Sequence, residues 1–194
     1  MEKNKTSKYQ HKVVTIPNIL SFFRLCLIPV FVWLYSIKDE YSAATAVLFL
    51  SGATDIVDGF IARRFNMISD FGKALDPVAD KLTQIVTLFC LCSRFRYMMI
   101  PLIILIVKEV FSGIVSLIAI NRSDEVQGAV WHGKLTTVLL YSTIVLHIIW
   151  WGLPSFISNI SILLCGGMLI FSGVLYAIRN FTIIKKCSKE KEIS

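Results

Sequence analysis

Long apolar segments alternate with short polar ones along the whole chain. A helix that spans the hydrocarbon core of a bilayer needs about 20 consecutive, mostly apolar residues. Six segments approach or reach this length: Ile16–Ser36, Ala43–Arg64, Leu75–Ser93, Tyr97–Ile120, Leu135–Trp151 and Phe156–Phe181. The pattern therefore predicts an all-α integral membrane protein with six transmembrane helices.

The composition agrees with this prediction. Apolar residues make up 55% of the 194 residues and charged residues only 17%, against about 45–50% and about 25% in soluble domains. Disorder and an ordinary soluble enzyme are therefore poor interpretations. The length predicts one membrane domain over residues 1–194, with a basic N-terminal segment at 1–15 and a charged tail at 185–194. The first apolar run is too long for a signal peptide and contains Arg24, so we expect a retained first span.

Basic residues gather in alternate connections between the predicted spans. The N-terminal segment, the second and fourth connections and the C-terminal tail, together with the span ends beside them, hold 14 of the 20 Lys and Arg residues, whereas the other connections hold three. Cytoplasmic loops carry an excess of Lys and Arg. We therefore expect a multi-pass protein of the cell membrane with both termini in the cytoplasm. The net charge of +7 mostly reflects this topology, and no nucleic-acid partner is expected.

Acidic residues gather on both sides of one predicted cytoplasmic connection. Asp55, Asp58, Asp70, Asp76 and Asp80 fall within 26 residues. Asp55 and Asp58 have i, i+3 spacing at the end of the second span, and Asp76 and Asp80 have i, i+4 spacing at the start of the third, so each pair shares a helix face. If these helices are antiparallel neighbours, the two pairs face each other and form a cytoplasm-facing polar site. Asp70 is expected to be a loop charge.

Four facing carboxylates repel one another unless they are protonated or neutralised by cations. A pair of divalent metal ions is the simplest neutraliser, and all-oxygen ligation suits Mg²⁺, Mn²⁺ or Ca²⁺ better than Zn²⁺. A two-metal carboxylate site commonly handles phosphate. Solvated surface carboxylates and an ion-coupled transporter are the alternatives. The position of the acids at one edge, rather than midway across the spans, favours the phosphate site.

Two runs of sequence around these acids resemble the signature of the CDP-alcohol phosphotransferase (CDP-alcohol phosphatidyltransferase) family. The run from Asp55 to Arg63 is DIVDGFIAR and, eight residues later, the run from Gly72 to Asp80 is GKALDPVAD. All eight fixed positions of D-x2-D-G-x2-A-R-x8-G-x3-D-x3-D match in type and spacing. Residues 16–24 (IPNILSFFR) and 132–137 (HGKLTT) resemble segments of the phosphatidylglycerophosphate synthase branch, which is grouped with cardiolipin synthase.

The resemblance implies ligands and roles for the matching residues. Two Mg²⁺ or Mn²⁺ ions are expected on Asp55, Asp58, Asp76 and Asp80, and Asp80 is expected to act also as the general base on the acceptor hydroxyl. The residues expected around the CDP-alcohol are Asn18, Gly59, Ala62, Arg63, Ser69 and Gly72. The implied donor is CDP-diacylglycerol in the lipid bilayer, CMP is the leaving product, and the protein is expected to be a homodimer.

The signature specifies the donor, and the acceptor is inferred from the branch. We expect transfer of the phosphatidyl group to glycerol 3-phosphate, which gives phosphatidylglycerophosphate in phospholipid biosynthesis. The candidate cations for the acceptor phosphate are Arg24, Lys81, Lys108 and Lys134. For Arg24 the alternative is a snorkelling side chain, and for Lys108 it is a buried ion pair.

Other functions are kept as alternatives. The branch carries an Arg-Glu pair in its fourth helix, where this chain has Lys108 and Glu109. A lysine supplies charge without bidentate geometry. Cardiolipin synthase, whose acceptor is phosphatidylglycerol, is therefore the alternative function. A membrane prenyltransferase, which also uses paired aspartates and Mg²⁺, and an ion-coupled transporter are less favoured.

Overall fold

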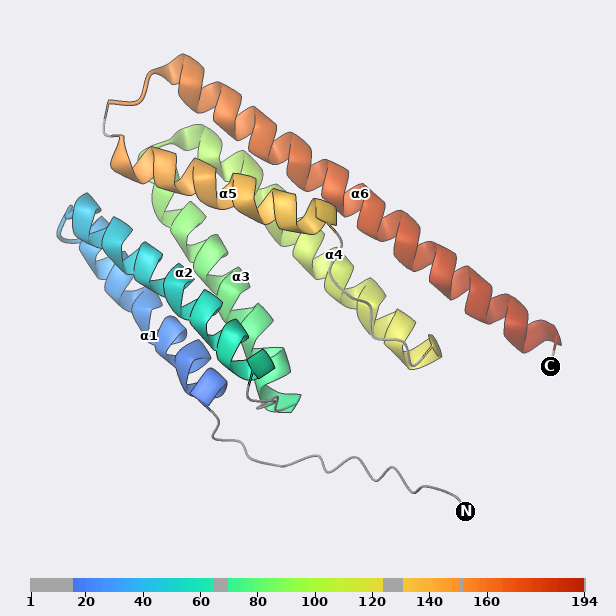
Figure 1. Ribbon diagram of the computed structural model, residues 1–194. Coiled ribbons are helices and arrows are strands. Elements are labelled where there is room, and N and C mark those ends of the chain that lie inside the picture. Colours follow the sequence, from blue (N-terminus) through green and yellow to red (C-terminus); the bar gives the residue numbers. More distant parts are fainter. Residues whose placement is uncertain (1–15, 65–69, 124–130, 151, 194) are drawn as a thin grey trace. The chain divides into compact units, whose positions relative to one another are not determined.

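The computed structural model describes residues 16–64, 70–123, 131–150 and 152–193, and it describes side chains except at 16–17, 58–63, 70–74, 116–123, 180 and 183–193. The backbone in these ranges forms six α-helices and one 3-10 turn, with no strand. In chain order they are α1 (Ile16–Ser36), α2 (Tyr41–Arg64), α3 (Asp70–Cys92), η1 (Arg96–Met98), α4 (Met99–Ser123), α5 (Trp131–Ile149) and α6 (Ser155–Ile193). Figure 1 labels the α-helices. The all-α prediction is confirmed.

Each predicted span corresponds to one helix, but several helix ends differ from the prediction. α3 begins at Asp70, so the expectation that this residue lies in a loop is wrong. α5 begins at Trp131 and α6 continues to Ile193, which places part of the predicted tail in a helix. Hydropathy marks only the apolar part of a helix, whereas the i to i−4 hydrogen bonding of the backbone continues through polar turns.

In the part of the chain that the structure describes, four helices are long and apolar enough to cross a bilayer. They contain the stretches Asn18–Ser36, Arg96–Val115, Trp131–Ile149 and Ser155–Arg179, while α2 contributes the shorter apolar stretch Tyr41–Val57. A spanning segment needs about 20 mostly apolar residues. The fold is therefore that of a multi-pass membrane protein with four apolar candidate spans, and crossing by α2 and α3 stays a prediction.

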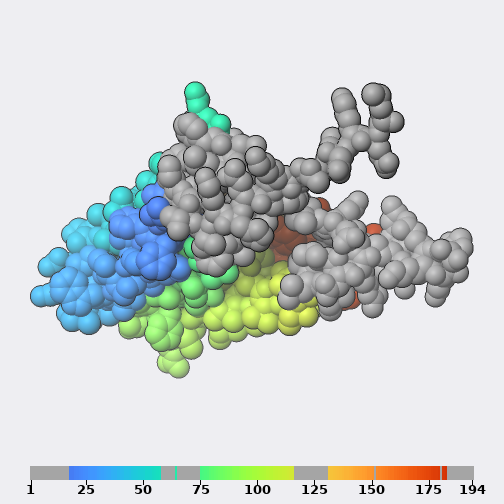
Figure 2. Space-filling view, turned by 90° about the horizontal axis from the view of Figure 1, so that it is seen from below, coloured from blue at the N-terminus to red at the C-terminus, as the bar shows by residue number. Residues whose placement is uncertain are grey.

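The distribution of side chains is inverted relative to a soluble helical protein. On α1, Phe22 and Phe23 are exposed, whereas Ser21 and Arg24 are buried. Figure 2 shows the α1 side chains (blue) at the surface of the N-terminal part of the chain. Large exposed apolar surfaces need an apolar environment, and in such an environment polar groups turn inward toward partners. The pattern therefore indicates that these helices face lipid.

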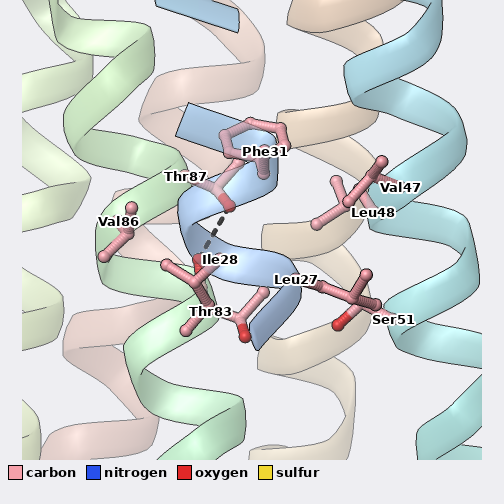
Figure 3. A pocket seen from close by; sticks show the side chains of 9 residues that line it. All are labelled: Leu27, Ile28, Phe31, Val47, Leu48, Ser51, Thr83, Val86 and Thr87. Atoms are coloured by element: carbon pink, nitrogen blue, oxygen red, sulfur yellow. Dashed lines mark hydrogen bonds between the residues drawn. The ribbon is translucent and has the colours of Figure 1, made fainter. Parts of the chain in front are cut away.

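The chain divides into two compact units, Met1–Thr87 and Leu88–Ser194, called here the N-terminal and C-terminal units. In the N-terminal unit, α1 packs against α2, and residues of α1, α2 and α3 line a small apolar pocket (Figure 3). Thr83 and Thr87 of α3 border it, and the Thr87 hydroxyl donates to the Thr83 carbonyl oxygen at 2.7 Å. This local bond satisfies a buried hydroxyl inside the packed helices.

In the C-terminal unit, α6 packs against both α4 and α5. His147 is fully buried there. Its Nδ1 lies 2.7 Å from the Thr143 carbonyl oxygen and its Nε2 lies 3.0 Å from the Ser158 hydroxyl. A carbonyl oxygen only accepts hydrogen bonds, so Nδ1 carries a proton, and in the neutral imidazole Nε2 then accepts from the Ser158 hydroxyl. This bond connects α5 to the start of α6.

Substituting Ser158→Ala is expected to destabilise the C-terminal unit by about 1–3 kcal/mol, because the buried Nε2 of His147 loses its donor. Thermal unfolding of the detergent-purified protein measures the effect. Ser142→Ala, at an exposed position of α5, serves as the matched control. Equal unfolding temperatures for the two variants would show that the His147–Ser158 bond contributes nothing.

Candidate functional site

Polar side chains from three helices meet at Arg24 in the N-terminal unit. The Arg24 side chain is only 2% exposed. Its Nη2 lies 2.7 Å from Oδ1 of Asp55 on α2, and its Nη1 lies 3.1 Å from Oδ1 of Asp76 on α3. The two carboxylates therefore pair with the two terminal nitrogens of one guanidinium. We call Arg24, Asp55 and Asp76 the carboxylate site.

Further polar contacts orient the carboxylates on α3. The Ser21 hydroxyl of α1 donates to Oδ1 of Asp76 at 3.4 Å. Asp80 lies one turn after Asp76, and its Oδ2 accepts from Gln84 Nε2 at 3.0 Å. The carboxylate of Asp55 also interacts electrostatically with those of Asp76 and Asp80. The site thus concentrates negative charge from α2 and α3 against one buried cation from α1.

The structure brings together part of the predicted metal and nucleotide set. Asp55, Asp76 and Asp80 lie in the N-terminal unit as described, and Asn18 is buried on α1, one turn before Ser21. The remaining predicted residues lie outside the residues whose side chains are described: Asp58, Gly59, Ala62, Arg63, Ser69 and Gly72.

The described carboxylates fit a hard divalent cation. They supply oxygen donors, which Mg²⁺ and Mn²⁺ prefer, and the side chains of Asp55 and Asp76 are 46% and 43% exposed, so an ion can reach them. Their pairing with Arg24 also shows that this position requires positive charge. Among the described side chains, no group of three or more His, Cys, Asp or Glu is arranged around one point, so the fit is carried by Asp55 and Asp76.

The four cations predicted for the acceptor phosphate lie in different surroundings. Arg24 is buried among carboxylates, so it does not extend outward as a snorkelling side chain would. Lys81 is half-buried on α3, and Lys134 is exposed on α5. Lys108 is largely buried on α4, and its Nζ pairs with the neighbouring Glu109 at 2.7 Å. For Lys108, the alternative of a buried ion pair is therefore what the structure shows.

A second polar cluster lies in the C-terminal unit around Tyr176 of α6. The His132 ring meets the Tyr176 ring edge-on at a centroid distance of 4.9 Å, and His132 Nδ1 lies 3.2 Å from the Ser172 hydroxyl. Lys108 Nζ lies 5.8 Å from the centre of the Tyr176 ring, within the range of a cation–π contact. His132 also interacts electrostatically with Lys108 and Arg179. This cluster places the positive charges of Lys108 on α4 and Arg179 on α6 near His132 of α5.

Sequence reasoning missed several residues that contact the predicted ones. Ser21 and Gln84 lie three residues before Arg24 and four after Asp80, so helical spacing is a signal that points to both. Tyr176 has no such signal, because the packing of α6 against α4 and α5 brings it to Lys108 and His132. Local periodicity therefore finds partners on the same helix only.

Comparison with known proteins gives a family and several relatives. A family model described as CDP-alcohol phosphatidyltransferase matches residues 14–178. The chain is 43% identical over 100 residues to a cardiolipin synthase (CMP-forming) of Streptomyces coelicolor, covering 48% of this chain and 46% of that protein. It is 37% identical over 101 residues to a CDP-diacylglycerol–glycerol-3-phosphate 3-phosphatidyltransferase of Pseudomonas fluorescens, covering 50% and 52%.

A protein with the same name as the Pseudomonas relative, from Blochmanniella floridana, is 32% identical over 130 residues, covering 64% of this chain and 68% of that protein. The chain thus spans about half the length of the Streptomyces and Pseudomonas relatives and about two thirds of the Blochmanniella one.

Gly133→Ala and Gly167→Ala are expected to change stability in opposite directions. A Cβ at Gly133 would lie 2.6 Å from the Tyr176 hydroxyl oxygen, whereas a Cβ at Gly167 meets nothing within 4 Å. Replacing a helical glycine at an open position stabilises by about 0.4–1 kcal/mol, but an overpacked position costs about 1–3 kcal/mol. Thermal unfolding of both variants tests this. A rise in unfolding temperature for Gly133→Ala would show that Tyr176 is not tightly placed.

Proposed function

The chain belongs to the CDP-alcohol phosphatidyltransferase family, and from this premise we propose that it transfers a phosphatidyl group from CDP-diacylglycerol to glycerol 3-phosphate. The observation that carries the proposal is the meeting of Asp55 and Asp76, two fixed positions of the family signature, at one buried arginine. The names of the Pseudomonas and Blochmanniella relatives support the same donor and acceptor.

We propose that Asp55, Asp58, Asp76 and Asp80 hold two Mg²⁺ or Mn²⁺ ions. Bound there, the ions supply charge stabilisation for the diphosphate of the CDP-alcohol. The residues proposed around the nucleotide and its phosphates are Asn18, Gly59, Ala62, Arg63, Ser69 and Gly72. Asn18 is buried on the same helix as Arg24, which supports a place for it beside the site.

Asp80 is the proposed general base. Its Oδ2 accepts from Gln84 Nε2, and this bond limits the rotation of the carboxylate so that it can meet an acceptor hydroxyl. The acceptor oxygen forms a bond to the lipid-side phosphorus as the bond from that phosphorus to the CMP oxygen breaks. The hydroxyl proton passes to Asp80, and CMP leaves with the electron pair of the broken bond.

The proposed topology keeps both substrates within reach. All six helices cross the cell membrane with both termini in the cytoplasm, as the excess of basic residues in alternate connections supports. The signature residues then lie at the cytoplasmic edge. The acyl chains of the donor stay in lipid while its headgroup reaches the carboxylates and a water-soluble acceptor arrives from the cytoplasm. We expect the active protein to be a homodimer.

The acceptor phosphate requires cations, for which Lys81, Lys108 and Lys134 are candidates with Arg24. The contact of Lys108 with Glu109 favours the second function, cardiolipin synthesis, because a phosphate at Lys108 would have to compete with a carboxylate already in place. The identity to the Streptomyces cardiolipin synthase supports the same alternative. The cluster around Tyr176 argues against cardiolipin synthesis. It contains Arg179 in addition to Lys108, and this positive charge supports the binding of the phosphate monoester of glycerol 3-phosphate.

Asp80→Asn is expected to lower turnover by about 10²–10⁴-fold, which is the range of general-base contributions. Release of CMP from CDP-diacylglycerol with glycerol 3-phosphate and Mg²⁺ measures it, and EDTA should abolish release by the unsubstituted protein. Glu40→Gln, at an exposed position between α1 and α2, is the control and should leave CMP release unchanged. Normal turnover by a folded Asp80→Asn protein would contradict the role of base.

Labelled CDP-diacylglycerol offered with single acceptors is expected to give phosphatidylglycerophosphate with glycerol 3-phosphate. The acceptors compared are glycerol 3-phosphate, phosphatidylglycerol, serine and inositol phosphate, and mass spectrometry distinguishes the lipid products. Cardiolipin formed from phosphatidylglycerol alone would replace the proposed acceptor with the alternative one. Diphosphate release from a prenyl diphosphate, without cytidine dependence, would contradict the whole assignment.

A further inference from the structure

We propose that Arg24 is the resident counter-ion of the carboxylate site and couples divalent-cation binding to the arrival of an anionic diphosphate. In this role Arg24 holds Asp55 and Asp76 together before any divalent cation binds, and its charge weakens cation binding until the diphosphate is present. The inference rests on the proposed function in taking these aspartates as metal ligands.

The burial of Arg24 supports the first part of this role. A guanidinium keeps its proton in proteins, so a side chain that is 2% exposed requires negative partners. Asp55 and Asp76 supply them from two other helices at 2.7 and 3.1 Å. Without Arg24, the adjacent carboxylates of Asp55 and Asp76 would repel each other. Arg24 is thus the cation that assembles the site in the absence of metal.

The atoms used in these contacts support the second part. Both described contacts are to Oδ1 atoms, and each half-exposed carboxylate has a second oxygen. A divalent cation that binds to these carboxylates is therefore placed near the guanidinium and is not required to displace it. Like charges repel most strongly where burial lowers the effective dielectric constant. Arg24 is expected to weaken cation binding to the substrate-free site.

Counting charges shows why a diphosphate relieves this repulsion. The four predicted aspartates carry four negative charges, so two divalent cations alone would neutralise them. With Arg24 added, the cation-loaded site has an excess of one positive charge. The diphosphate of a CDP-alcohol carries roughly two negative charges, so its binding changes the excess of one positive charge into an excess of one negative charge. Cation and diphosphate then strengthen each other's binding by the same factor, as linkage requires.

An orienting role alone predicts the opposite sign for substitution of Arg24. Residues that hold metal ligands in place typically cost about 10- to 100-fold in metal affinity when they are replaced. A counter-ion, when it is removed, leaves a more negative site that binds cations more tightly. The direction of the change in affinity therefore separates the two roles, and a conservative substitution separates charge from geometry.

The test measures Mn²⁺ binding to the full-length purified protein by electron paramagnetic resonance, with and without CDP as a soluble diphosphate probe. Without CDP, Arg24→Gln is expected to bind Mn²⁺ at least about tenfold more tightly than the unsubstituted protein. CDP should increase the Mn²⁺ affinity of Arg24→Gln by a smaller factor than it does for the unsubstituted protein. Arg24→Lys keeps the charge and should keep the weak, CDP-dependent binding. Arg96→Gln, an exposed arginine of the C-terminal unit, is the matched control for loss of one positive charge.

Thermal unfolding in EDTA is the second measurement. Arg24→Gln should unfold at a lower temperature than the unsubstituted protein, and Mn²⁺ should restore more of the loss than it does for Arg96→Gln. If Arg24→Gln fails to fold, comparison of Arg24→Lys with the unsubstituted protein decides the matter. Mn²⁺ binding that stays weak and CDP-dependent in Arg24→Lys supports the counter-ion, and loss of Mn²⁺ binding overturns it.

Unchanged or weaker Mn²⁺ binding by folded Arg24→Gln overturns the inference, as does a lack of Mn²⁺ binding in all variants with CDP present. The release of CMP decides the proposed function separately. A protein that forms no CMP but shows the predicted shift in Mn²⁺ affinity retains this inference and loses the phosphatidyltransferase assignment. If the unsubstituted protein releases CMP but Arg24→Gln has unchanged Mn²⁺ affinity, the phosphatidyltransferase assignment stands and this inference fails.

Discussion

The ion pairs of Arg24 with Asp55 and Asp76 are the interaction on which the candidate site depends. An apolar environment makes an isolated charge costly, so a buried guanidinium and its carboxylates must find one another. This requirement also explains the face that α1 turns inward. Asn18, Ser21 and Arg24 recur at intervals of three residues and are all buried, while the phenylalanines between them face outward.

The same constraint shapes the C-terminal unit without an aspartate cluster. Both ring nitrogens of His147 are hydrogen-bonded, to a carbonyl of its own helix and a hydroxyl of α6, while His132 pairs with Ser172 and packs edge-on against the ring of Tyr176. In both units buried polar groups lie between helices, while many large apolar side chains are exposed. Packing between these helices therefore relies on hydrogen bonds and small residues as well as apolar contact, as where Gly166 of α6 approaches Ile104 of α4.

The helices were predictable from sequence because apolar runs of this length have few other stable forms. The helix ends were less predictable, because polar first turns carry no hydropathy signal. Asp70 begins α3 and Trp131 begins α5, each earlier in the chain than the apolar pattern predicted. The aspartates of the candidate site were predictable as pairs from their helical spacing, and their proposed roles from a resemblance. The pairing of Arg24 with Asp55 and Asp76 was not predictable, because Arg24 is 52 residues from Asp76 and no sequence pattern links it to either aspartate.

The amino-acid sequence alone determined that the chain is helical and apolar, and which acids share a helix face, because these properties follow from local spacing and composition. Only the tertiary structure decided that Arg24 sits between two of those acids, that Lys108 pairs with Glu109, and that Tyr176 meets Lys108 and His132. A long side chain chooses its partner by burial and distance. Both depend on how helices distant in the chain pack, which local periodicity does not encode.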